Sequence, residues 1–145
     1  METGGLPMRG FFILLWALAI LIFTCTASFS ELIESGQVYF QWDSHPNFSE
    51  LLAPLPLELT RDFLLQKCGH ALAFLFLTIL LQTKFRSKAW ILFLAISFAS
   101  LTEILQLYFT RDGRIFDIAI DLIGILLATG SRSLFTTPQS KQTHL

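Results

Sequence analysis

Four stretches of the chain are long apolar runs bounded by charged or polar residues. A helix that crosses the hydrocarbon core of a membrane needs about 20 mostly apolar residues. The runs predict four such helices, at residues 11–29, 63–82, 89–109 and 115–130. The fourth is the shortest, because a rise of 1.5 Å per residue gives it a length of about 24 Å. The pattern therefore predicts an all-α membrane protein, with four transmembrane helices in a single integral membrane domain at residues 1–145.

The first apolar run has an alternative interpretation as a cleaved signal peptide. Arg9 precedes the run, and small residues stand near its end at 26–28. Both features are typical of signal peptides. The run is longer than most signal-peptide cores, and Phe23 and Thr24 before Cys25 do not suit a lipoprotein cleavage site. We expect a retained helix, with the signal peptide as the alternative.

The basic residues of the short connections predict the orientation. Short loops rich in Lys and Arg tend to stay in the cytoplasm, and the connection between the second and third runs carries Lys84, Arg86 and Lys88. If this connection is cytoplasmic, both termini and the polar tail at 131–145 are cytoplasmic too. The segment at 30–62, which is rich in acidic, aromatic and proline residues, then forms an outer loop.

Polar side chains within and beside the last three helices share one end of the membrane. An ionisable group inside a membrane costs about 2.5 to 3.5 kcal/mol on insertion scales, so each one requires a partner or a role. With the orientation above, all of them fall in the outer leaflet, which indicates one shared pocket between helices 2, 3 and 4. The candidate ligand-binding residues are Lys67, His70, Glu103, Gln106, Arg111, Arg114, Asp117 and Asp121.

Their spacing supports a common pocket. Residues three or four apart project from the same helix face, as do Asp117, Asp121 and Gly124. Gly124 would let a neighbouring helix approach closely. Asp121 lies one turn deeper than Asp117, so it needs either a cation, such as Lys67 or Arg114, or a proton.

Each group also has an interpretation without a ligand. Lys67 would snorkel to the membrane surface, and the 110–114 turn would be solvated, with Gly113 supplying the tight bend. His70, Glu103 and Asp121 would form a hydrogen-bond network between helices.

Composition and motifs exclude several classes of protein. The chain is 53% hydrophobic and 14% charged with a net charge of -1, which argues against a soluble domain and against nucleic-acid binding. Cys25 and Cys68 do not form a zinc or disulfide motif. A zinc site from His70, Glu103 and Asp117 is geometrically conceivable but has no supporting ligand spacing. We expect no metal and no cofactor.

The order of these polar residues resembles that of the VanZ-like family of small bacterial membrane proteins, named for a teicoplanin-resistance protein. The resemblance covers residues 63–130. Two positions depart from it, since Gln66 stands where the family usually has Asp, and Asp121 where it usually has Asn. The motif runs Lys67-x-x-His70, Glu103-x-x-Gln106, and Arg114-x-x-Asp117-x-x-x-Asp121-x-x-Gly124, followed by Gly130.

The resemblance implies a protein of the cell envelope, with a role in antibiotic resistance through lower glycopeptide susceptibility. The leading hypothesis is the binding of an anionic membrane lipid or lipid-linked cell-wall precursor, without turnover. The alternative is a membrane enzyme in which Glu103 or His70 is the base and Asp117 or Asp121 the acid. A proton-coupled carrier is less favoured, because four short helices leave little room for alternating access.

Overall fold

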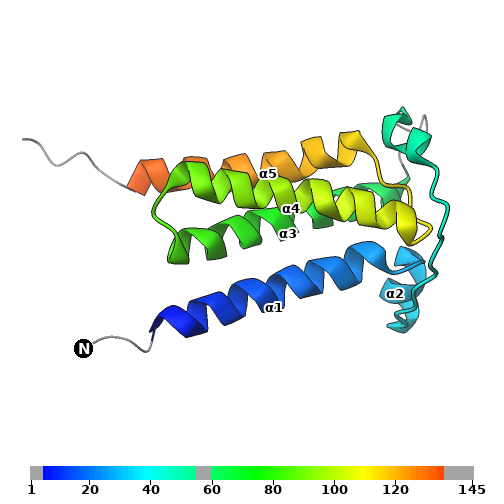
Figure 1. Ribbon diagram of the computed structural model, residues 1–145, viewed down its shortest axis with the longest axis horizontal. Helices are drawn as coiled ribbons and strands as arrows, with labels where there is room; N and C mark the ends of the chain where they lie inside the picture. Colours follow the sequence, from blue (N-terminus) through cyan, green and yellow to red (C-terminus); the bar gives the residue numbers. More distant parts are fainter. Residues whose placement is uncertain (1–4, 55–59, 136–145) are drawn as a thin grey trace, which may run out of the picture.

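Four long helices run side by side in the part of the chain that the structure describes. The computed structural model describes residues 5–54 and 60–135, so the predicted tail lies outside the described residues from 136 onward. The short helices α2 (Phe29–Ser35) and η1 (Phe48–Leu52) lie at the end of the bundle opposite the N-terminus (Figure 1). The long helices are α1 (Gly5–Cys25), α3 (Arg61–Lys84), α4 (Lys88–Tyr108) and α5 (Ile115–Phe135).

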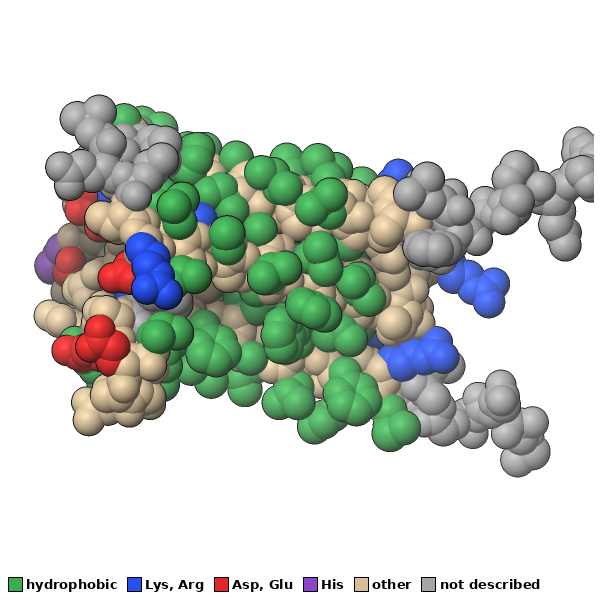
Figure 2. Space-filling model, turned by 180° about the vertical axis from the view of Figure 1, so that it is seen from behind, with side chains coloured by type: hydrophobic (Ala, Val, Ile, Leu, Met, Phe, Trp, Pro, Cys, Tyr) green, Lys and Arg blue, Asp and Glu red, His purple; other side chains and the backbone are tan. Residues whose placement is uncertain are grey.

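Three of these helices are long and apolar enough to cross a membrane: α1 from Met8 onward, α3 and α4. Large apolar side chains are exposed on their outer faces, including Leu14 at 71% and Phe93 at 60%. Figure 2 shows them as a broad band across one face. Such a surface is far more apolar than that of a soluble monomer, so the helices suit a lipid environment.

The ends of α1 and α5 differ from the predicted ones. α1 ends at Cys25 instead of continuing to Phe29, because Ser28 starts α2 by accepting a hydrogen bond from the Glu31 backbone N–H. α5 continues five residues past the predicted end at Gly130. Its 21 residues give a length of about 31 Å, which removes the shortfall expected from the sequence.

The core forms where α3 meets α5 and α4. Phe74 of α3, Ala95 of α4 and Ile125 of α5 are completely buried. Gly124 lies directly against the α3 backbone, because a Cβ atom there would overlap the carbonyl group of Ala71. The expected close approach at Gly124 is therefore present, and the neighbouring helix is α3.

Two side chains attach α1 to the rest of the bundle. Trp16 donates from Nε1 to the Ala73 carbonyl at 2.9 Å, and Arg9 donates to the Thr83 carbonyl at 2.8 Å. These bonds lie near the middle and the start of α1. They join α1 to α3 at two points along its length.

Replacing Trp16 with phenylalanine is expected to weaken this attachment. The variant loses the bond to Ala73, and hydrogen bonds between membrane helices contribute about 0.6 kcal/mol on average. We expect a loss of about 0.6 to 1 kcal/mol in reversible unfolding in mixed micelles. Trp90→Phe is the matched control, because Trp90 is 57% exposed; equal losses in the two variants would contradict a specific role for the Trp16 bond.

The described part of the segment at 30–62 is held at the ends of α1 and α4. The Ala27 N–H donates to the Tyr39 carbonyl at 2.9 Å, and the Asp43 N–H donates to the Tyr108 carbonyl at 2.8 Å. The Trp42 ring stacks on Tyr108 with the ring centres 5.2 Å apart. The described part of this segment therefore contacts the bundle end formed by the end of α1 and the end of α4.

Candidate functional site

Lys67 and Asp117 form an ion pair between α3 and α5. The Lys67 Nζ lies 2.6 Å from Asp117 Oδ1, and the two side chains are 12% and 1% exposed. The ammonium also lies 4.9 Å from the centre of the Phe63 ring, one turn earlier on α3, a cation–π contact. Lys67 is thus held by protein groups, which argues against simple snorkelling.

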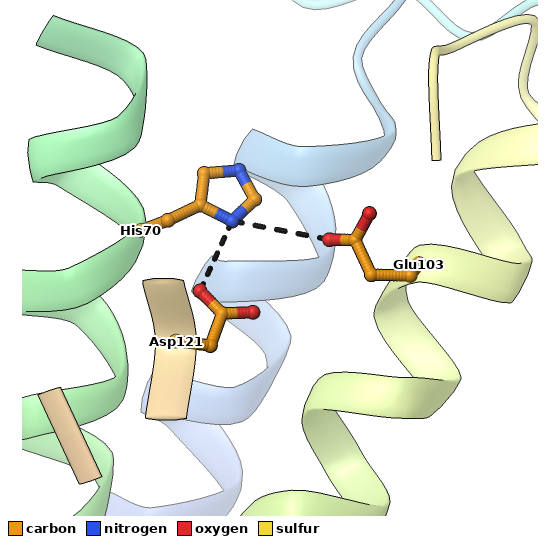
Figure 3. Close-up of side chains that lie close together, drawn as sticks. All are labelled: His70, Glu103 and Asp121. Atoms are coloured by element: carbon orange, nitrogen blue, oxygen red, sulfur yellow. Dashed lines mark ion pairs between the residues drawn. The ribbon is translucent and has the colours of Figure 1, made fainter. Parts of the chain in front are cut away.

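His70, Glu103 and Asp121 meet one turn deeper, each contributed by a different helix (Figure 3). The His70 Nδ1 lies 3.3 Å from Asp121 Oδ1 and 4.0 Å from Glu103 Oε1. The closer contact has the length of an ion pair but lacks the alignment of a hydrogen bond. Both carboxylates are completely buried, so α3, α4 and α5 enclose a polar centre.

The Glu103 carboxylate is oriented by two donors. Gln106 Nε2 donates to Oε1 at 2.9 Å, and the backbone N–H of Arg114 donates to Oε2 at 2.9 Å. The second bond ties the end of α4 to the turn that leads into α5. A buried carboxylate with two donors keeps one orientation.

The turn at 110–114 is shaped differently from the expected solvated bend. Thr110, not Gly113, adopts the left-handed conformation, with φ of 54°. Gly113 is buried, and a Cβ atom there would overlap the Glu103 carbonyl oxygen. The glycine is therefore required for close packing against α4, while Arg114 binds the exposed Asp112 at 3.1 Å.

A polar cavity of about 430 Å³ opens beside this centre. Three cationic side chains reach it, and the Arg111 guanidinium forms no ion pair with any residue in the described ranges. Burial lowers the pKa of Arg111 from its ordinary value, although an arginine stays charged in a protein. The lining residues are Ala27, Thr60, Phe63, Gln66, Lys67, Thr110, Arg111, Asp112 and Arg114.

A second cavity, of about 280 Å³, lies between α1, α2 and α3 and is mostly apolar. Trp16, Phe23 and Phe76 contribute to its wall. Gln66 lines both cavities. An apolar space and a cationic space therefore border the same side chain of α3.

The structure brings all eight predicted residues to one end of α3, α4 and α5, but with different partners than expected. Asp121 approaches His70, a pair that the network interpretation placed together, and not Lys67 or Arg114, which were the cations considered for it. The zinc set considered from the sequence included Asp117, which instead pairs with Lys67.

Sequence reasoning missed Phe63 and the double role of Gln66. Both precede Lys67 on α3, and Phe63 is four residues before it, a spacing that places the two on one face. That spacing was the available signal for the cation–π contact.

Comparison with known proteins places the chain among membrane proteins. No family model matches it, and no solved structure matches it. The uncharacterized membrane protein YwnJ of Bacillus subtilis (strain 168) is 40% identical over 116 residues, which cover 79% of this chain and 83% of YwnJ. The chain therefore belongs to the same family as YwnJ, a family of membrane proteins, and its fold is all-helical.

Proposed function

We propose that the protein is a VanZ-like, multi-pass protein of the cell membrane that binds an anionic lipid, or a lipid-linked envelope precursor, at an outer-leaflet site. In this proposal α1, α3, α4 and α5 all cross the membrane, and both termini are cytoplasmic. Occupation of the site lowers susceptibility to a glycopeptide such as teicoplanin.

The distribution of charge along the bundle supports this orientation. The connection between α3 and α4 carries Lys84, Arg86 and Lys88, and short basic loops favour the cytoplasmic side. The acidic side chains visible in Figure 2 gather at the opposite end, which carries α2 and η1. This end would face outward together with the polar cavity.

The observation that carries the lipid proposal is Arg111 at the polar cavity, which has no ion pair within residues 5–54 and 60–135. Asp117 already neutralises Lys67 and Asp112 binds Arg114, so Arg111 remains to bind an added anion. A guanidinium binds a phosphate or carboxylate through two parallel hydrogen bonds. The apolar cavity next to Gln66 suits the hydrocarbon chain of the same ligand.

The resemblance to VanZ-like proteins supports the envelope role. The motif residues Lys67, Glu103 and Asp117 lie in one connected cluster with the partners described above. Gln66 and Asp121 still depart from the usual family pattern. The link to teicoplanin rests on the resemblance and is tested separately below.

The enzyme alternative has less support from the geometry. Glu103 and Asp121 are completely buried and line neither of the two cavities. Among the candidate acids and bases, only His70 lines one of them, the mostly apolar cavity. A general acid or base must reach the proton that it transfers, directly or through one water molecule. The conclusion is therefore a binding function.

Replacing Arg111 with glutamine is expected to reduce binding of anionic lipid about tenfold, because a charge-assisted bidentate contact is lost. The purified protein would be incubated with equal amounts of phosphatidylglycerol and phosphatidylcholine, and bound lipids counted by native mass spectrometry. The native chain should prefer phosphatidylglycerol and the variant should not.

Arg86→Gln is the matched control, because Arg86 lies in the connection at the opposite end of the bundle. An equal preference of all three chains for phosphatidylglycerol would contradict the site. In a Gram-positive host with matched membrane levels, the native chain should raise teicoplanin tolerance more than Arg111→Gln does. Equal teicoplanin tolerance of the native chain and Arg111→Gln would show that the polar cavity is not needed for this tolerance.

A further inference from the structure

The buried cluster in Figure 3 has the composition and spacing of a metal site. It offers one imidazole nitrogen, from His70, and one carboxylate oxygen each from Glu103 and Asp121. These three atoms lie within 4.8 Å of one another. Zn²⁺ binds nitrogen and oxygen at about 2.0 to 2.2 Å, so tetrahedral ligands lie about 3.3 to 3.5 Å apart. The His70–Asp121 distance of 3.3 Å already fits, whereas Glu103, 4.0 Å from His70 Nδ1, must move closer to reach that spacing.

Several atoms of the cluster lack a hydrogen bond. Neither carboxylate oxygen of Asp121 accepts a hydrogen bond from the residues that the structure describes, and His70 Nδ1 does not donate one to them. Asp121 is completely buried and His70 is 8% exposed. The ion-pair contact between His70 Nδ1 and Asp121 Oδ1 at 3.3 Å is not aligned as a hydrogen bond, and buried polar atoms rarely lack one. Here they face one another across a small gap, as metal ligands do.

The charge of the buried cluster also favours a bound cation. It contains three carboxylates, from Glu103, Asp117 and Asp121, and one ammonium, from Lys67. With a neutral imidazole, ionised carboxylates leave two negative charges without a counter-ion inside the bundle. Uncompensated charge inside a membrane is strongly unfavourable. Bound protons would reduce it, and one divalent cation would remove both negative charges.

We propose that His70, Glu103 and Asp121 bind one divalent transition-metal ion, with Zn²⁺ as the best fit. An imidazole ligand favours such an ion over Mg²⁺ or Ca²⁺, which prefer oxygen ligands alone. This proposal replaces the expectation of no metal and goes beyond lipid binding. The donors at Glu103 support it, because hydrogen bonds from Gln106 and from the Arg114 backbone orient this carboxylate as outer partners orient metal ligands.

The test measures metal content and its effect on stability. The full chain would be purified in detergent, treated with EDTA, and then equilibrated with Zn²⁺, Mn²⁺, Mg²⁺ or Ca²⁺. We expect about one Zn²⁺ per chain by elemental mass spectrometry and a rise in the midpoint of thermal unfolding. Mg²⁺ and Ca²⁺ should have neither effect. Zn²⁺ binding does not depend on lipid, so this result is separate from the outcome for Arg111→Gln.

Two pairs of variants locate the ion. His70→Gln and Asp121→Asn should each weaken Zn²⁺ binding at least tenfold. His45→Gln and Cys68→Ser, which change the other described histidine and the exposed cysteine, should keep it. If His70→Gln does not fold, the native chain alone remains decisive, because no bound ion and no shift in unfolding would overturn the proposal. Unchanged Zn²⁺ content in Asp121→Asn would overturn it as well.

Discussion

Gly124→Ala is expected to lose about 3 kcal/mol of stability, because the added methyl group overlaps the α3 backbone. A Cβ atom at position 124 would collide with the carbonyl group of Ala71 and approach the backbone nitrogen of Leu75. Backbone atoms of a packed helix do not move aside as a flexible side chain does, so α3 and α5 must separate. Overpacking of this kind costs about 1 to 3 kcal/mol or more. Reversible unfolding in mixed micelles measures the loss.

Gly69→Ala is the matched control for this variant. Gly69 also lies in a long helix, α3, but a Cβ atom there has nothing within 4 Å. Alanine stabilises a helix interior by about 1 kcal/mol relative to glycine. The control should therefore be neutral or slightly more stable. Equal stability of Gly124→Ala and Gly69→Ala would show that the α3–α5 contact is looser than described.

Lys67→Met is expected to lose about 3 to 5 kcal/mol, the usual cost of leaving one partner of a buried ion pair alone. Asp117 is 1% exposed, and its side chain forms an ion pair with Lys67 at 2.6 Å. The methionine fills a similar volume but supplies no charge. The same unfolding measurement applies, with Lys88→Met as the control, because Lys88 is exposed at the start of α4.

A double variant shows how much of the loss in stability comes from leaving Asp117 without its partner. Lys67→Met with Asp117→Leu removes both charges, and replacing a buried pair by apolar residues is often neutral or stabilising. The double variant should therefore recover most of the stability that Lys67→Met loses. If Lys67→Met alone costs as little as Lys88→Met, the snorkelling interpretation of Lys67 is correct instead.

The helices were predictable from the sequence because their signal is local. Long apolar runs bounded by charge indicated the four long helices of the bundle, and the i, i+3 spacings indicated which polar residues share a face. The helix ends were less predictable. α1 stops early because Ser28 caps α2, and α5 continues to Phe135 through a stretch less apolar than its start.

The partners within the polar cluster depended on contacts between helices. Lys67 pairs with Asp117, and His70 with Asp121, only because Gly124 lets α5 lie against α3 in one register. A rotation or one-turn shift of α5 would exchange these pairs without changing any local pattern. Gly113 likewise has its role from the close approach of the turn to Glu103.

By itself, the sequence determined that this chain forms long apolar helices with polar residues gathered at one end, because hydrophobicity and helical periodicity are properties of neighbouring residues. Only the tertiary structure decided which buried charges meet, that Arg111 at the polar cavity has no ion pair among the described residues, and that one imidazole and two carboxylates share a centre. Those features arise from the packing of three helices, and packing depends on shape at positions far apart in the chain.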